Sequence, residues 1–317
     1  MSMRYAVDTW APDYGTSREE QLREASRPVD AAVEVPLDEW EPIEPPANTA
    51  VPDTITFVDG VRRIDARIWI ADSEFTDKPG VCATVAAGAV RCSPGSATID
   101  AVTIERALFT SAERAEALDL GPAGRYELRP LPVATDDALY LAVHGHMTKV
   151  EQDLSEELDR STMVIFDGPL GLRDGVNCAG YIKSQHVQYL DEALNPVIGR
   201  LGDGQRTPLF HLGGELPSWS WYLRLPGPRS HAMSGVVRIE LPGLGDADGA
   251  AARADEISRA LPRFASEPHK DARSPQNLYP IAGLERELRR RLGDATLLDR
   301  ALRRNAAASA ALARTLG

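Results

Sequence analysis

The stretch "TITFVDGVRRIDARIWI", residues 54–70, decides the fold class. Its first half runs apolar residues into Asp59-Gly60, and its second half alternates, with one face formed by Ile64, Ala66, Ile68 and Ile70. Period-two alternation is typical of a half-buried strand, and Asp-Gly is typical of a tight turn. We therefore predict two strands joined in a hairpin at Asp59, followed by a third strand in "GVCATVAAGAVR", residues 80–91.

A second apolar run ends in the same way. In "STMVIFDGPLGL", residues 161–172, bulky apolar residues lead into Asp167-Gly168, the pattern of a buried central strand. Further strands are predicted for "SWSWYLRL", residues 218–225, and "SGVVRIELP", residues 234–242. Together these segments predict a mixed α/β fold with a partly antiparallel sheet.

Helices are expected between and after these strands. Residues 136–160 carry the clearest helical spacing, with apolar positions at Met147, Val150, Leu154 and Leu158. Residues 101–118, 254–265 and 281–293 also read as helical. We divide the chain into an acidic, proline-rich arm (1–50), a main domain (51–295) and an alanine-rich C-terminal helix (296–317).

Composition narrows the class of protein. The 317 residues carry a net charge of -12, of which residues 1–50 contribute -7 from eleven acidic and four basic side chains. No apolar run reaches the roughly 20 residues needed to span a bilayer, and the N-terminus lacks a secretory pattern, so we expect a cytoplasmic protein without membrane contact. Three cysteines without CxxC spacing are expected to be reduced and packed: Cys82, Cys92 and Cys178.

Two aspartates stand at the ends of apolar runs that should be buried. The pairs at Asp174 and Asp203 lie in glycine-rich segments and are read as turns, whereas Asp59 and Asp167 follow predicted strands. A buried carboxylate is costly unless a cation meets it. Two such strand ends side by side would offer oxygen ligands to one divalent ion; ordinary turns are the alternative.

Glu151 is the candidate for a third oxygen donor. Its helical neighbours at i-4, i+3 and i+7 are Met147, Leu154 and Leu158, so it borders the face expected to pack on the sheet. Glu156 is expected to face solvent. The alternative for Glu151 is a boundary residue of an amphipathic helix.

Five segments in order carry a family resemblance: "TFVDG", "VIFDGPL", "AGYIKSQ", "VVRIELP" and "NLYPIAGLE". With Glu151 before the second, this order resembles the NurA nuclease family over about residues 52–292, as a divergent bacterial-type member. The resemblance implies a ribonuclease-H-like fold related to Piwi domains, a mixed sheet flanked by helices. It also implies manganese-dependent DNA cleavage, a homodimer and partnership with a HerA-type hexameric ATPase.

The resemblance implies roles for individual carboxylates. Asp59 matches the metal aspartate of the first strand and Asp167 the second, and both would bind Mn²⁺ or Mg²⁺ directly. Glu151 matches the intervening glutamate, although Glu156 and Glu157 are close enough to compete for that role.

Substrate contacts are implied at positions later in the chain. Lys183 in "GYIKS" would face the phosphate, or be an ordinary surface lysine. Arg238 alternates with Glu240 on one strand face, where a structural ion pair is an equal alternative to a substrate contact. Tyr279 matches the late Tyr-Pro of the family. The C-terminal arginines, among them Arg289 and Arg290, would hold the DNA backbone or form a solvated helix face.

One departure from the family pattern is a missing histidine, because Glu287-Leu288 stands where the family has Ala-His. We predict that Glu285 supplies an oxygen instead, oriented by Gln276 or Asn277, although an i,i+4 pair with Arg289 is the simpler alternative. His144 and His146 have alternating spacing and are read as a loop or helix-entry pair, with a metal role as the alternative.

The predicted function is a metal-dependent DNA nuclease acting on DNA ends, in repair or defence. The alternative is a catalytically inactive NurA-like adaptor, favoured by the missing histidine. A carboxylate-pair glycosidase lacks the aromatic platform that sugars favour, since aromatics are only 6% of the residues. The absence of GxSxG and GxxxxGK[ST] sequences argues against a serine hydrolase and an ATPase.

Overall fold

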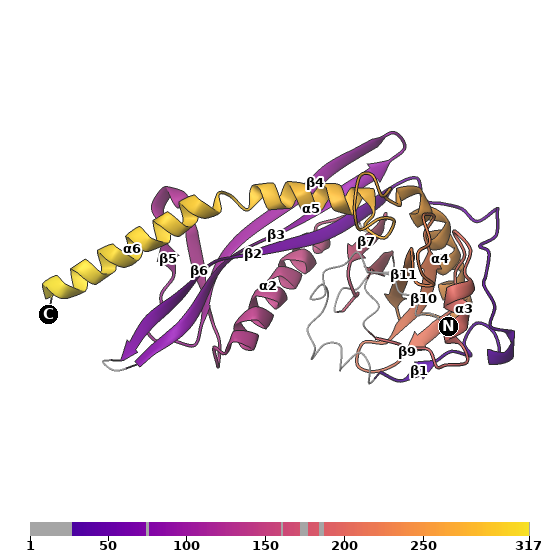
Figure 1. Cartoon of the computed structure of the whole chain (residues 1–317), viewed down its shortest axis with the longest axis horizontal. Helices are drawn as coiled ribbons and strands as arrows, with labels where there is room; N and C mark the ends of the chain where they lie inside the picture. Colours follow the sequence, from indigo (N-terminus) through magenta and orange to yellow (C-terminus); the bar gives the residue numbers. More distant parts are fainter. Residues whose placement is uncertain (1–26, 74–75, 160, 172–176, 184–186, 317) are drawn as a thin grey trace, which may run out of the picture. The chain divides into compact units, whose positions relative to one another are not determined.

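The computed structural model describes residues 27–316 except 74–75, 160, 172–176 and 184–186 (Figure 1). The chain is a mixed α/β protein that divides into two compact units. Unit 1 comprises Met1–Val58, Val90–Thr98 and Asp159–Ala282; unit 2 comprises Asp59–Ala89, Ile99–Leu158 and Gly283–Gly317. The predicted domain boundaries at residues 50 and 295 stay a prediction.

Unit 1 is built on a mixed sheet. Its strands lie in the order β1 (Val29–Asp30), β9 (Phe210–Leu212), β10 (Ser218–Arg224), β11 (Val236–Pro242), β8 (Cys178–Ile182), β7 (Met163–Asp167) and the start of β2 (Ile55–Ser73). Pairing is antiparallel from β1 to β8 and parallel from β8 through β7 to β2. The predicted strands at 161–172, 218–225 and 234–242 are confirmed, and β7 is the buried central strand expected.

Among the described residues of unit 1 are helices α3 (Asn195–Arg200) and α4 (Ala247–Ala260), the latter followed by a 3-10 turn at Leu261–Phe264. Asp246 caps α4, since its carboxylate accepts from the amide of Gly249 at 2.8 Å. The indole of Trp221 on β10 donates to Ser258 on α4 at 3.0 Å, which fixes the helix against the sheet. The helix predicted at residues 254–265 is therefore confirmed.

Residues 27–50, interpreted as part of an arm or linker, are instead built into unit 1. Trp40 is buried in its apolar core, and Arg206 binds both Glu34, at 2.7 Å, and Asp255, at 2.7 Å. Arg27 donates to the carbonyl of Gly213 at 3.1 Å. Apolar and charged side chains of this segment contact residues far along the chain. The segment is therefore packed, although it is rich in proline. Residues 1–26 of the predicted arm lie outside the described residues.

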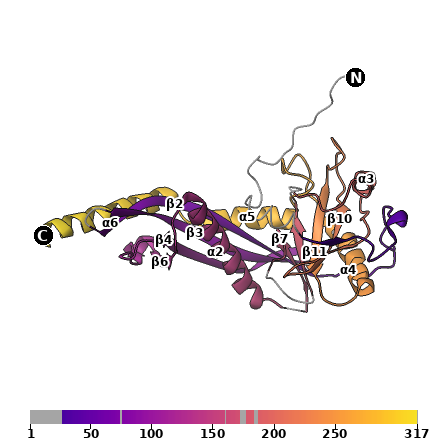
Figure 2. The ribbon, with the colours of Figure 1, turned by 90° about the horizontal axis from the view of Figure 1, so that it is seen from below.

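Unit 2 contains the rest of β2, followed in order by most of β3 (Thr76–Ser93), most of β4 (Ser96–Thr110), β6 (Arg125–Pro130) and β5 (Leu118–Asp119). Helix α2 (Asp136–Glu156) lies beside these strands (Figure 2). The C-terminal helices are α5 (Tyr279–Arg291) and α6 (Ala295–Leu316). Leu284 and Leu288 of α5 lie against Gly88 of β3. The helices predicted at 136–160, at 281–293 and in the alanine-rich tail are confirmed.

Two predictions for unit 2 are wrong. Asp59-Gly60 is not a hairpin corner, because β2 runs unbroken from Ile55 to Ser73 and Gly60 lacks the positive φ of such a turn. The helix expected at residues 101–118 is largely strand β4, which pairs in parallel with β6 over Ala107–Thr110. Its β-branched residues and pairing partners outweigh the helical spacing of its alanines and leucines.

The cysteines are free and buried, as expected: Cys82, Cys92 and Cys178. In the described part of the chain, every helix is too short or too polar to cross a lipid bilayer.

Candidate functional site

Lys183 and Asp167 form a buried ion pair at the end of β7. The ammonium Nζ lies 2.6 Å from Oδ2 of Asp167 and 3.1 Å from Oδ1 of Asn277. The side chain of Lys183 is only 3% exposed and that of Asp167 13%. Lys183 is therefore not the surface lysine of the alternative interpretation, since a buried ammonium must be compensated by charge and hydrogen bonds.

A loop before α5 orients this pair. The amide of Asn277 donates to Oδ2 of Asp271 at 2.6 Å, which turns its oxygen toward Lys183. Burial alone would raise the pKa of Asp271, but hydrogen bonds from Arg273 and Asn277 hold that pKa below its usual value. Gln276 donates to the carbonyl of Lys183 at 3.3 Å. We predicted that Gln276 or Asn277 would orient Glu285; the structure places both at Lys183, and sequence reasoning missed Asp271.

Asp59 lies at the start of the unit 2 portion of β2, and Glu151 lies on α2, which packs against that portion. Asp59 is 7% exposed and accepts from the amide of Gly60 at 2.8 Å. Glu151 is 3% exposed, and a Cβ added to Gly60 would lie 2.2 Å from its Oε1. Glu151 thus packs on the β2 backbone next to Asp59, as predicted for the helix face, whereas Glu156 is exposed. Since side chains alternate along a strand, the Gly60 position rather than that of Asp59 faces α2.

The two strand-end aspartates follow residues that are in register. In the parallel pairing of β2 with β7, Val58 lies opposite Phe166. The next residues along the two strands are Asp59 and Asp167. Among the described residues, no group of three or more histidine, cysteine, aspartate or glutamate side chains is placed to hold a metal ion. The metal centre predicted for Asp59, Glu151 and Asp167 stays a prediction.

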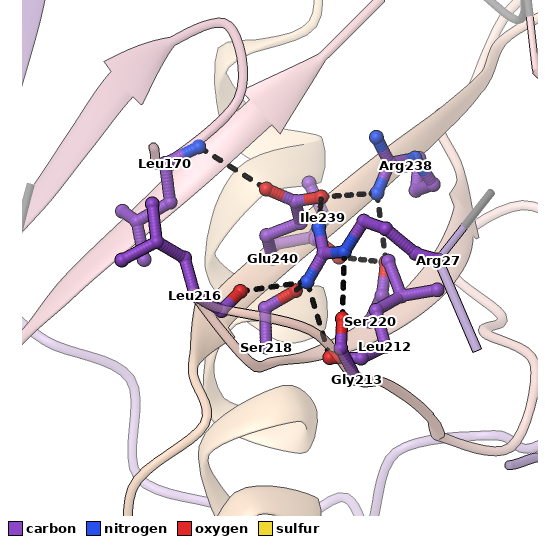
Figure 3. A network of polar contacts seen from close by, with 10 residues as sticks. All are labelled: Arg27, Leu170, Leu212, Gly213, Leu216, Ser218, Ser220, Arg238, Ile239 and Glu240. Atoms are coloured by element: carbon purple, nitrogen blue, oxygen red, sulfur yellow. Dashed lines mark hydrogen bonds and ion pairs between the residues drawn. The ribbon is translucent and has the colours of Figure 1, made fainter. Parts of the chain in front are cut away.

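Arg238 and Glu240 form a buried ion pair on β11 (Figure 3). The guanidinium of Arg238 also lies over the ring of Tyr189, 4.5 Å from its centroid. Burial would raise the pKa of Glu240, but the charge of Arg238 and the amide of Leu170 hold that pKa below its usual value. Arg238 is only 4% exposed, which fits the structural alternative rather than the predicted substrate contact.

Glu240 also supports the turn that follows Asp167. Its Oε2 accepts from the amide of Leu170 at 3.1 Å (Figure 3). A Cβ added to Gly180 on β8 would lie 2.9 Å from both the carbonyl of Gly168 and the amide of Leu170. Only a residue without a side chain at position 180 lets this turn pack so closely. The close packing on Gly180 and the hydrogen bond to Glu240 together fix the backbone beside Asp167.

Arg27 reaches the same network from the N-terminal segment. Its Nη1 lies 4.0 Å from Oε1 of Glu240, and its Nη2 donates to Ser218 at 3.0 Å and to the carbonyl of Leu216 at 2.8 Å (Figure 3). Arg27, the first described residue, thus binds the same polar network as Glu240, which supports the turn after Asp167.

The candidate residues of α5 are paired within their own helix. Glu285 accepts from Arg289 at 2.9 Å, which is the i,i+4 pair of the alternative interpretation. Glu287 binds Arg290 at 2.6 Å and Arg291 at 2.6 Å, and these hydrogen bonds lower the pKa of Glu287 to about 2. The roles predicted for Glu285, Arg289 and Arg290 stay predictions, with much of their charge balanced locally.

Tyr279, predicted to contact substrate, lies at the start of α5. Its hydroxyl donates to Oε2 of Glu267 at 3.0 Å, and the ammonium of Lys270 lies 4.9 Å from the ring centroid. The residue is therefore held by an exposed cluster of side chains in unit 1.

His144 and His146 lie inside α2, not at its entry. His144 contacts Arg62 of β2, 2.8 Å from Nδ1 to Nη1. His146 lies 3.1 Å from Glu105 of β4 and packs edge-on against Phe109. The loop or helix-entry interpretation is wrong, because the helix begins at Asp136, capped by Thr135.

No family model matches the chain, and no curated protein matches it. Among solved structures, the chain is similar to the crystal structure of the NurA nuclease from Sulfolobus solfataricus, with 11% sequence identity and a TM-score of 0.47. The similarity covers 80% of this chain and 82% of that one. The same family was named on the five sequence segments. A likeness of this size assigns neither family nor activity to the chain.

Proposed function

We propose that the protein is a divalent-metal-dependent DNA nuclease. The observation that carries this proposal is the pair of strand ends at β2 and β7, where the register of Val58 with Phe166 is followed on each strand by an aspartate. The buried cation beside Asp167 adds support, because a phosphodiester needs positive charge near the carboxylates that serve it.

The donor chemistry at these strand ends fits Mg²⁺ or Mn²⁺. Both ions favour oxygen ligands, and Mg²⁺ is often bound by one or two carboxylates together with water and substrate phosphates. Asp59 and Asp167 would hold the ion. Glu151 is the predicted third donor, but it packs against Gly60 and not on the side of β2 that carries Asp59. When bound, such an ion supplies Lewis-acid activation of water and charge stabilisation at the scissile phosphate.

The other residues would orient and balance charge. Lys183, buried and held by Asn277, would keep Asp167 ionised and would act through that carboxylate, in place of the phosphate contact predicted for it. Contacts to phosphate alone carry no base information, so cleavage would be independent of sequence. Glu285, Arg289, Arg290 and Tyr279 remain candidates for contacts with the DNA backbone.

The proposed partners come from the family resemblance, and the proposed location comes from the sequence pattern. We place the protein in the cytoplasm as a homodimer that processes DNA ends with a HerA-like hexameric ATPase. A motor that feeds DNA to the nuclease would also explain how a chain with a net charge of -12 acts on a polyanion.

Labelled single-stranded and double-stranded DNA, incubated with Mn²⁺, Mg²⁺ or EDTA, tests the activity. Cleavage should require metal and should fall by at least about a hundredfold in Asp59→Asn and Asp167→Asn. Asp203→Asn, an exposed Asp-Gly aspartate paired with Arg229, is the matched control. Equal cleavage by the wild type and both strand-end variants would refute the proposal.

A second candidate is the catalytically inactive adaptor. The observation in its favour is the close pair of Lys183 and Asp167, which satisfies the carboxylate within the protein. An adaptor would bind a HerA-like ATPase or DNA and cleave nothing with any metal. Binding retained without cleavage, in protein that unfolds cooperatively, would select this candidate.

A further inference from the structure

Arg62 of β2 contacts two side chains of α2. Its Nη1 lies 2.8 Å from Nδ1 of His144, and its Nη2 donates to the hydroxyl of Tyr140 at 2.5 Å. The guanidinium carbon lies 4.8 Å from the centroid of the Tyr140 ring. Arg62 is thus fixed on α2 through a neutral oxygen, an imidazole nitrogen and an aromatic face.

The charge of Arg62 is not balanced in the way that its neighbours' charges are. Arg63 pairs with Asp65 at 2.7 Å, and Arg67 pairs with Asp136. Within the described residues, no carboxylate pairs with Arg62. A protein with 47 acidic and 35 basic side chains has acids to spare, so an arginine fixed without one is a candidate for binding an external anion.

The position of Arg62 relates it to the candidate carboxylates. On α2, residues Tyr140, His144, Met147 and Glu151 recur at intervals of three or four, which places them on one helix face. Glu151 and Met147 lie against Gly60, and His144 and Tyr140 contact Arg62 two residues further along β2. The contact between β2 and α2 therefore runs from the buried carboxylate of Glu151 to Arg62, whose guanidinium lies over the ring of Tyr140.

The guanidinium of Arg62 and the ring of Tyr140 suit binding of a nucleic-acid strand. A guanidinium binds phosphate through two parallel N–H donors, and its planar geometry is retained while it stacks on a ring. Tyr140 is 42% exposed, which leaves part of the ring open to solvent. Aromatic rings beside cations are the usual platform for single-stranded DNA, because every base has a face that can stack.

We propose that Arg62, Tyr140 and His144 form a phosphodiester-binding subsite that holds a single DNA strand next to the Asp59 and Glu151 end of β2. This proposal rests on the proposed function, since it names where the substrate of that site is held. Arg62 binds the phosphate, Tyr140 supplies the stacking face, and His144 holds the guanidinium in place.

The test measures binding in EDTA, so that cleavage plays no part. A fluorescein-labelled oligothymidine is titrated with the full chain, and fluorescence anisotropy gives the affinity at several KCl concentrations. Arg62→Gln should weaken binding about tenfold at low salt and reduce the slope of log K against log[KCl] by about 0.7, the loss of one contact with single-stranded DNA. Arg62→Lys should restore the slope but only part of the affinity, because the fork geometry is lost.

Arg67→Gln is the matched control, since it removes an arginine from the same strand that already has a carboxylate partner. It should leave both affinity and slope within error of the wild type. Tyr140→Ala should weaken binding without changing the slope, because it removes stacking and no charge. Thermal unfolding of each variant separates a lost contact from a lost fold.

The results distinguish the subsite from the nuclease proposal. Normal affinity and slope in Arg62→Gln, or equal losses in Arg62→Gln and Arg67→Gln, would overturn the subsite. If the expected slope change is found but no metal supports cleavage, the subsite stands and the nuclease proposal fails.

Discussion

The ammonium of Lys183 lies 2.6 Å from Oδ2 of Asp167, inside the protein, with the amide oxygen of Asn277 at 3.1 Å on the same nitrogen. These groups come from three separate parts of the chain: the end of β7, the residue after β8 and the loop before α5. Because both charges are largely buried, each depends on the other, and several expected outcomes follow from that dependence and from the packing around it.

Lys183→Met should lower the free energy of unfolding by about 3–5 kcal/mol, because it leaves Asp167 buried without its cation. Urea denaturation followed by circular dichroism measures this change. Adding Asp167→Leu should recover part of the loss. The control is Lys149→Met, which breaks the exposed i,i+4 pair with Asp153 and should cost about 1 kcal/mol or less. A loss in Lys183→Met no larger than in the control would contradict the buried pair.

Gly60→Ala should destabilise the protein by about 1–3 kcal/mol, because the added Cβ would lie 2.2 Å from Oε1 of Glu151. Gly145→Ala is the matched control: it lies in α2 with nothing within 4 Å of an added Cβ, and should stabilise by about 1 kcal/mol. Thermal melts of the two variants should therefore shift in opposite directions. Equal shifts would show that Glu151 does not occupy the space beside Gly60.

Arg238→Met should cost about 3–5 kcal/mol of stability, because it leaves Glu240 buried and unbalanced. It should leave the salt dependence of DNA binding unchanged, because Arg238 is buried and paired with Glu240. Chemical denaturation and anisotropy titrations measure the two effects. Arg303→Met, which removes an exposed partner of Asp299, is the control and should cost little. A reduced salt slope in Arg238→Met would restore the substrate-contact interpretation.

Acid should weaken the fold through His146. Burial of its ring in unit 2 lowers its pKa below the ordinary 6.5, against the opposing effect of Glu105; the nearby charge of Arg129 also lowers it. Since the unfolded chain binds the proton more readily, this contribution to stability is present above pH 6.5 and is lost as the pH falls from 6.5 through the folded value. The melting temperature of the wild type should fall between pH 7 and pH 5.

The matched pair His146→Gln and His269→Gln isolates this effect. His146→Gln should flatten the fall in melting temperature, whereas His269→Gln should not, because the side chain of His269 is 69% exposed. The same pH dependence in both variants would assign the acid sensitivity to other groups.

Local pattern was sufficient for many elements of the fold. Strands β7, β10 and β11 and helices α2, α4 and α5 follow from apolar runs and helical spacing, because each buries a continuous face whose period is visible in the sequence. The same spacing placed Glu151 on the sheet-facing side of α2 and Glu156 in solvent. It failed at residues 101–118, where β4 pairs with β6 and tertiary pairing overrides helical propensity.

Asp59-Gly60 shows what could not be predicted from the sequence. The sequence by itself determined that a carboxylate follows a buried apolar run and that a glycine comes next. Only the tertiary structure decided what lies there: the carboxylate of Glu151, 91 positions later, fills the space beside the glycine, and the strand does not turn. The ion pair of Lys183, its support by Asn277 and the seating of Arg62 on Tyr140 were likewise decided by packing, because contacts between distant segments leave no period in the sequence.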